Sequence, residues 1–250
     1  MTTLTDFYHW ILTQPNLIAS RSPFSDLSGL QSQPLPERSQ YQGNRRLGFL
    51  YQHLCTEAFK LSPHYQVAME EIQLNQDGKT LGAIDLLVSN RQDEQLEHWE
   101  VAIKFYLLHQ GTWFGPNAHD QLDKKLDRML NHQLAMSRSE TFHQHYPQLD
   151  VTSHHLLMQG RLYTNPFSHE ITPTHCLNHP INPNIINGYW CFYSQSHQIE
   201  QELFHLSKDR WATGLGESRE SVTASPERFI HAQTECGQFW FVVPDGWPGH

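Results

Sequence analysis

Apolar residues recur with a helical period in three segments of the chain. Residues 4–13 are mainly apolar and aromatic, which predicts a short docking helix. In residues 45–61 the apolar positions lie three or four apart, and the pair Ser62-Pro63 ends the predicted helix. A third helix is expected to open at Pro116-Asn117. Its buried stripe would consist of Leu122, Leu126, Met129, Leu130 and Leu134.

Between and beyond these helices, apolar residues form short runs or alternate with polar ones. Six segments are expected as strands: residues 67–74, 81–88, 98–108, 154–164, 188–194 and 238–244. The first two are joined by a tight turn at Asp77-Gly78. Residues 20–44 and 165–187 are expected as loops, and a polar helix is expected near 198–208.

The order of these elements indicates the fold class. A helix, three strands, a helix and a fourth strand favour an α/β protein with a central mixed β-sheet flanked by helices. Residues 1–165 are expected to form this core. Residues 166–250 are expected to form a C-terminal extension that packs on the core and does not fold independently.

Three charged residues interrupt the second and third strands. A hairpin centred between Gln92 and Asp93 places Asp85 opposite Glu100, with Cβ atoms about 5 Å apart. Two carboxylates this close repel each other unless a cation lies between them. Because Mg²⁺ takes one or two carboxylates plus waters and phosphate oxygens, the pair predicts a metal site for phosphoryl chemistry. Lys104 shares the face of Glu100 and could reach a phosphate or a metal-bound water.

The same pattern also fits a half-exposed sheet in which Glu100 and Lys104 form a surface ion pair. The opposite face of the third strand is apolar and is expected to be buried under the helix Arg46–Leu61. The residues of that face are Trp99, Val101, Ile103 and Phe105.

These segments resemble the PD-(D/E)XK nuclease superfamily. The likeness is carried by a helix, GAIDLLV with an acid in the second strand, WEVAIKF with an acid and a lysine in the third, then a helix and a fourth strand. More closely, the chain resembles the bacterial domain-of-unknown-function family 1853 in RRLGFLY, WEVAIKFYL, the GPN–DQLDKKL helix and YHWILTQPNLI. The likeness covers most of the first 165 residues and implies a restriction-endonuclease-like core.

The superfamily resemblance implies Mg²⁺- or Mn²⁺-dependent cleavage or binding of nucleic acid. Carried over residue by residue, Asp85 and Glu100 would be metal ligands, and the backbone carbonyl of Val101 would complete the inner shell. Lys104 would orient the attacking water or stabilise the charged transition state.

Two positions depart from the superfamily pattern. The usual lysine stands two residues after the acid, where this chain has Ala102, and Lys104 lies about 6.8 Å further along the strand. The first helix often supplies an acid, and the matching position here is Gln52, with Glu57 and Glu71 as possible substitutes.

Other groups of residues have two interpretations each. On the third helix, Lys124, Lys125 and Arg128 could contact phosphates or form a solvated face. Trp113 and Phe114 could stack on a base, although core packing is expected for at least one of them.

A zinc site is a further alternative. His175, Cys176 and His179 could hold Zn²⁺ if a fourth ligand were nearby. The sequence has no partner for them at zinc-finger spacing.

Composition limits the partners and the cellular compartment that we expect for the protein. The chain has 250 residues, 38% of them hydrophobic, and contains no apolar run long enough for a membrane span. The formal net charge of −9 argues against broad adhesion to nucleic acid or to an anionic membrane surface, but allows a local basic groove. The N-terminus lacks the pattern of a signal peptide, and the four scattered cysteines suit a reducing cytoplasm.

Two functions therefore remain open. One is a metal-dependent nuclease that hydrolyses nucleic-acid phosphodiesters. The other is a catalytically impaired relative that keeps the fold in order to bind nucleic acid or another protein. The choice between DNA and RNA and the oligomeric state do not follow from the sequence.

Overall fold

The computed structural model describes residues 4–37, 39–217 and 219–249. Within these ranges nine strands join into one mixed sheet in the order β1-β2-β3-β5-β8-β11-β10-β9, and β4 pairs with β3. Strands β6 and β7 form a separate hairpin. The strands are β1 Tyr65–Gln76, β2 Lys79–Asn90, β3 Gln95–His109, β4 Thr112–Phe114, β5 Val151–Thr164, β6 His175–Cys176, β7 His179–Pro180, β8 Ile186–Phe192, β9 Leu203–His205, β10 Ile230–Thr234 and β11 Phe239–Val243.

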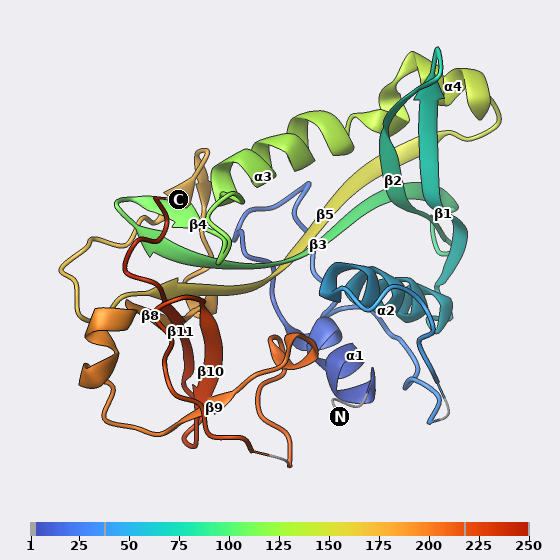
Figure 1. Ribbon diagram of the computed structural model, residues 1–250. Helices are drawn as coiled ribbons and strands as arrows, with labels where there is room; N and C mark the ends of the chain where they lie inside the picture. Colours follow the sequence, from blue (N-terminus) through green and yellow to red (C-terminus); the bar gives the residue numbers. More distant parts are fainter. Residues whose placement is uncertain (1–3, 38, 218, 250) are drawn as a thin grey trace.

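The helices lie on both sides of this sheet, as Figure 1 shows. They are α1 Leu4–Thr13, α2 Leu47–Lys60, α3 Leu122–Arg128 and α4 Glu140–His145. Helix α3 continues into a π-helical turn at Met129–Gln133 and is followed by a 3-10 turn at Met136–Arg138. In the described ranges, no helix has the length and apolar character needed to cross a membrane. The prediction of a central mixed sheet flanked by helices is thus confirmed.

The centre of the sheet is parallel and its margins are antiparallel. Strands β3, β5, β8 and β11 pair in parallel, whereas β1, β2 and β3 form an antiparallel meander and β9 to β11 a second antiparallel margin. The C-terminal strands therefore continue the same sheet as β3 and β5. The predicted boundary after residue 165 falls just beyond the end of β5.

Helix α2 covers the face of β3 that the alternation pattern predicted. Trp99, Val101 and Phe105 are buried there with Leu54 and Phe59 of α2. The rings of Phe59 and Trp99 meet edge to face at 4.9 Å. The fourth residue of that face, Ile103, differs in its burial.

Ile103 is only half-buried, so its predicted burial under the helix is wrong. The reason is that the neighbouring edge of β3 borders a groove. The other face of β3 packs on α3 through a second apolar cluster, which includes Ala102, Tyr106, Leu122 and Leu126.

The β1–β2 hairpin leaves the main sheet and rises beside α4, as the upper right of Figure 1 shows. Its far half has its own small core, formed by Ile72, Leu74, Ile84, Leu87, Met136 and Phe142. Gly82 lies close to this core, where an added Cβ atom would be 1.8 Å from the terminal methyl of Met136 and would force this flexible side chain to move. The far half of the hairpin thus packs on the turns after α3, whereas the near half of β2 pairs with β3.

Several sequence-based expectations need correction. The third helix begins at Leu122 and not at Pro116-Asn117, because residues 115–120 form a tight turn in which the Gly115 N–H donates to the Asp120 carbonyl. The polar helix expected near 198–208 is wrong, since strand β9 lies there between two 3-10 turns. Strands β4 and β10 and helix α4 were not expected. All three are short, so their pairing and packing outweigh their local pattern.

Candidate functional site

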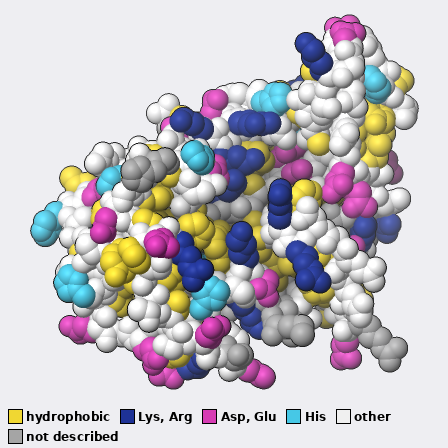
Figure 2. Space-filling view, in the orientation of Figure 1, with side chains coloured by type: hydrophobic (Ala, Val, Ile, Leu, Met, Phe, Trp, Pro, Cys, Tyr) yellow, Lys and Arg dark blue, Asp and Glu magenta, His cyan; other side chains and the backbone are white. Residues whose placement is uncertain are grey.

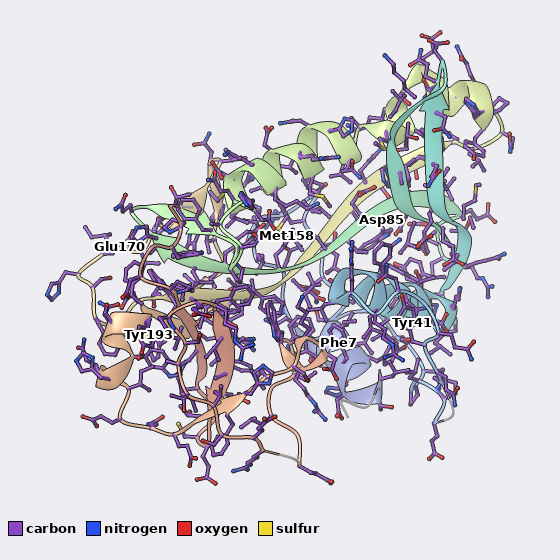
Figure 3. All side chains as sticks on the ribbon, in the orientation of Figure 1. Phe7, Tyr41, Asp85, Met158, Glu170 and Tyr193 are labelled. Carbon is purple, nitrogen blue, oxygen red and sulfur yellow. The ribbon has the colours of Figure 1, made fainter. Side chains whose placement is uncertain are left out.

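Asp85 and Glu100 lie where β2 separates from β3. Backbone pairing of the two strands runs from Asn90↔Gln95 to Leu86↔Trp99 and ends immediately before the two acids. Figure 3 labels Asp85 at this junction, at the base of the β1–β2 hairpin and beside β3. The predicted placement of the two carboxylates on adjacent antiparallel strands is therefore confirmed.

The two carboxylates replace the backbone ladder at this point. The Val101 N–H donates to Asp85 Oδ2 at 2.9 Å, and the Asp85 N–H donates to Glu100 Oε1 at 3.3 Å. In an extended strand the N–H and C=O of one residue point to the same edge. The Val101 carbonyl therefore faces the side on which Asp85 lies.

Burial makes both acids hard to ionise. Glu100 is 1% exposed and Asp85 is half-buried. Burial, followed by the negative charge of Glu100, raises the pKa of Asp85 to about 8. Burial also raises the pKa of Glu100 to about 7. Without a cation, the pair therefore holds protons at pH values where ordinary carboxyls are ionised.

Glu100 is held by two further side chains. Nε2 of His98, which is fully buried, lies 2.9 Å from Glu100 Oε1, and Nε2 of Gln133 donates to Glu100 Oε2 at 3.3 Å. Gln133 also donates to the Ala83 carbonyl of β2. Burial lowers the pKa of His98 to about 4, so its imidazole is neutral near pH 7. Gln133 thus connects the turn after α3 to both strands of the site.

Lys104 does not reach the carboxyl pair. Its Nζ donates to Asp120 Oδ2 at 2.5 Å, and the Tyr106 hydroxyl donates to the other oxygen of Asp120. Gly160 lies opposite Lys104 in β5, where a Cβ atom would be 1.6 Å from the Lys104 carbonyl oxygen. The close approach of β3 and β5 at Lys104 therefore requires glycine at this position.

Lys125 is the cation that acts on both acids. Its charge lowers the pKa of Asp85 and of Glu100, against the larger effect of burial. Burial and then the charge of Lys104 lower the pKa of Lys125 itself. In the part of the chain that the structure describes, Lys125 has no ion pair within 4.0 Å. The half-buried Lys125 is nevertheless close enough to the Asp85–Glu100 pair and to the Lys104–Asp120 pair for the charges of both to act on its pKa.

The other two cations predicted on this helix point elsewhere. Lys124 and Arg128 are exposed, whereas Lys125 turns inward on the face of α3 that carries the buried Leu122. The structure thus separates three residues that the sequence treated as one group.

A groove of about 730 Å³ lies along the open edge of β3, where Ile103, Lys104 and Phe105 line it, whereas Asp85 and Glu100 do not. Between the ladders with β2 and β4, the described chain provides no strand partner for residues 100–106 of this edge. Figure 2 shows a hollow across the middle of this face with Lys and Arg side chains gathered around it. Arg46, Lys104 and Lys208 line the groove together with Asp120. The groove is locally basic although the whole chain is acidic.

The structure shows the burial and the contacts of the positions that depart from the superfamily pattern. Ala102 is 8% exposed and packs in the apolar cluster under α3. Gln52 is half-buried on α2. The suggested substitutes lie elsewhere, because Glu57 pairs with Lys60 at 3.3 Å and the exposed Glu71 acts on the pKa of Tyr41.

The two candidate metal sites differ in the ligands that they offer. Among the described residues, no group of three or more His, Cys, Asp or Glu side chains is arranged to hold a metal ion, and Asp85 and Glu100 offer two carboxylates only. This argues against the zinc site suggested at His175, Cys176 and His179, which form the small β6–β7 hairpin. Two converging carboxylates beside a backbone carbonyl suit a hard cation that keeps several of its waters.

Some participants were missed at the sequence level. His98 stands two residues before Glu100 and therefore on the same face of the strand. This spacing is the sequence signal by which His98 could have been found. Gln133 and Asp120 gave no such indication, because only the path of the chain after β3 brings them to the site. The expectation that at least one of Trp113 and Phe114 packs in the core is confirmed, since Trp113 is buried in the core under α3.

Fold and site together define a mixed α/β protein with a carboxylate pair at the open edge of its central sheet. The family model described as Domain of unknown function (DUF1853) matches residues 8–235. The chain belongs to this family. Neither a curated protein nor a solved structure matches the chain.

Proposed function

We propose that the protein is a Mg²⁺-dependent nuclease of the PD-(D/E)XK type that hydrolyses nucleic-acid phosphodiesters. The observation that carries this proposal is the convergence of Asp85 and Glu100 at the point where β2 leaves β3. The raised pKa values of both acids support it, because a buried pair of carboxyls without a counterion is costly unless a ligand uses them.

In this proposal each residue has a defined task. Asp85, Glu100 and the Val101 carbonyl would hold Mg²⁺, which when bound supplies an activated water and neutralises charge on the phosphate. Lys125 has the position to stabilise negative charge that develops on the scissile phosphate. It would thus take the part that the superfamily gives to a lysine two residues after the acid, where this chain has Ala102.

The groove supports a polyanionic substrate. Arg46, Lys104 and Lys208 offer cations along its length, and Trp211 and Phe229 offer partly exposed aromatic rings. Cations that follow a backbone and rings that accept bases are the usual elements of nucleic-acid binding.

A second function has its own support. Asp120 already neutralises Lys104, and Ala102 leaves β3 without a lysine next to the acid. These observations favour a catalytically impaired relative that uses the same groove to bind nucleic acid or a protein.

Calorimetric titration with Mn²⁺ tests whether the protein has a metal site. The wild-type chain should bind Mn²⁺, Asp85→Asn should not, and the exposed Asp150→Asn should bind as the wild type does. Cleavage of labelled single-stranded and duplex DNA and RNA in the same buffer then distinguishes enzyme from binding module. If the wild type binds no Mn²⁺ at millimolar concentration, even with an oligonucleotide present, the metal-dependent proposal fails.

A further inference from the structure

A continuous chain of hydrogen bonds connects Glu100 with the protein surface. It runs from Glu100 Oε1 to His98 Nε2 at 2.9 Å and from His98 Nδ1 to the Ser137 hydroxyl at 2.8 Å. From Ser137 it continues to His154 Nε2 at 3.0 Å, and His154 Nδ1 lies 3.0 Å from Arg138 Nη2. His98 and Ser137 are buried, His154 is half-buried and Arg138 is exposed.

The surface end determines the direction of the chain. An arginine guanidinium can only donate, so Nδ1 of His154 must accept and carries no proton. Neutral His154 therefore has its proton on Nε2 and donates to the Ser137 oxygen. Having accepted this bond, Ser137 keeps its single hydroxyl proton available, and its short contact to Nδ1 of His98 is the place where this proton can be donated.

The buried end favours the same direction once Glu100 is ionised, which is the state in which it could hold a cation. A carboxylate can only accept, so an ionised Glu100 favours a proton on Nε2 of His98. Both ends thus favour the same tautomer of His98. Every bond in the chain donates toward Glu100, and the two histidines lie side by side in register on β3 and β5.

We propose that Arg138 is a positioning residue for Glu100. By fixing the tautomers of His154 and His98, Arg138 ensures that Glu100 Oε1 always faces an N–H donor and never a bare imidazole nitrogen. This donor holds the carboxylate in its orientation beside Asp85 while leaving other lone pairs for a cation. The inference rests on the proposed function only where it concerns the metal, because the tautomers can be measured in the metal-free protein.

The first test is a nitrogen NMR spectrum of the metal-free protein with labelled histidines, recorded above the raised pKa values of Asp85 and Glu100 so that Glu100 is ionised. His98 and His154 should both show a protonated Nε2 and an unprotonated Nδ1. Arg138→Glu places an acceptor at the surface end, so His154 should change to the Nδ1–H tautomer and His98 should show a measurable fraction of it. Arg138→Lys keeps a donor and should retain the wild-type tautomers. Arg91→Glu, an equal charge change at an exposed arginine outside the chain, should leave both histidines unchanged.

Metal binding gives the second readout. Mn²⁺ affinity should fall about tenfold or more in Arg138→Glu, be restored in Arg138→Lys and be unchanged in Arg91→Glu, because partners behind a ligand commonly have effects of this size. An Nδ1–H tautomer of His98 in the wild type, or unchanged tautomers in Arg138→Glu, would overturn the proposal. If the wild-type tautomers are as expected but Mn²⁺ does not bind, the metal site fails and the positioning role of Arg138 stands.

Discussion

The side chain of Asp85 takes the place of a backbone partner for Val101. Its Oδ2 accepts the Val101 N–H at 2.9 Å at the position where the ladder between β2 and β3 stops. The two strands therefore separate without leaving this buried donor unsatisfied. The same separation opens the edge of β3 on which the candidate site depends.

The carboxyl pair should make the metal-free protein less stable as the pH rises. The folded-state pKa values of about 8 for Asp85 and about 7 for Glu100 exceed the ordinary values of 3.8 and 4.5. Between about pH 4 and pH 8 this pair consequently binds more protons in the folded than in the unfolded state, so its contribution to the free energy of unfolding falls with rising pH. Urea denaturation at pH 7 and pH 8 measures the loss, because the buried histidines with lowered pKa values are neutral in both states there. Asp85→Asn should reduce it, and Mn²⁺ should oppose it at pH 8; an equal pH dependence in the variant would contradict the assignment.

Two adjacent lysines on α3 should behave differently. Lys125→Ala should lower nuclease turnover by about 10²-fold or more, as the loss of a charge-stabilising group commonly does. Lys124→Ala is the matched control and should retain activity, because Lys124 is exposed whereas Lys125 is half-buried. Metal affinity should survive in both variants, as measured by Mn²⁺ titration. Similar losses of turnover in the two variants would rule out a special role for Lys125.

Neighbouring apolar residues of β3 should differ in their effect on stability. Phe105→Ala removes a ring that is 6% exposed and should lower the free energy of unfolding by about 3–5 kcal/mol. Ile103→Ala should cost less than about 2 kcal/mol, since Ile103 is half-buried and borders the groove. Urea denaturation of both variants provides the comparison. A larger loss for Ile103→Ala would show that the groove is closed in solution.

Gly160→Ala should be strongly destabilising. The added methyl group would lie 1.6 Å from the Lys104 carbonyl oxygen, so β3 and β5 would have to move apart. The expected cost is at least about 1–3 kcal/mol, the usual range for overpacking. Gly29→Ala is the control, because nothing lies within 4 Å of its added methyl group. Thermal unfolding of the two proteins is sufficient, and equal midpoints would mean that the two strands can separate at this point without cost.

Binding of nucleic acid in the groove should depend on salt. Arg46→Ala should weaken binding of a single-stranded oligonucleotide and reduce the slope of log K against log salt concentration by about 1. Lys79→Ala removes an exposed lysine at the far tip of the β1–β2 hairpin and should change neither quantity. Fluorescence anisotropy between about 50 and 200 mM salt measures both. An unchanged slope in Arg46→Ala would place the binding surface elsewhere.

The sequence determined much of the first half of the fold. Long periodic segments identify α1, α2 and strands β1, β2, β3 and β5, because helical and alternating spacing directly reflects which side chains must be buried. Alternation together with the hairpin centre also placed Asp85 opposite Glu100, since pairing within one hairpin depends on local geometry. The strongly apolar strands β8 and β11 were likewise recognised from composition.

Tertiary structure decided the surroundings of the acids. Whether β2 stays beside β3 or leaves it depends on the packing of the hairpin against the turns after α3, and no local pattern records that choice. The inward turn of Lys125, the capture of Lys104 by Asp120 and the chain from Glu100 to Arg138 all depend on segments distant in sequence. Such contacts result from burial and hydrogen bonding across the whole fold, so residue types and spacing alone do not specify them.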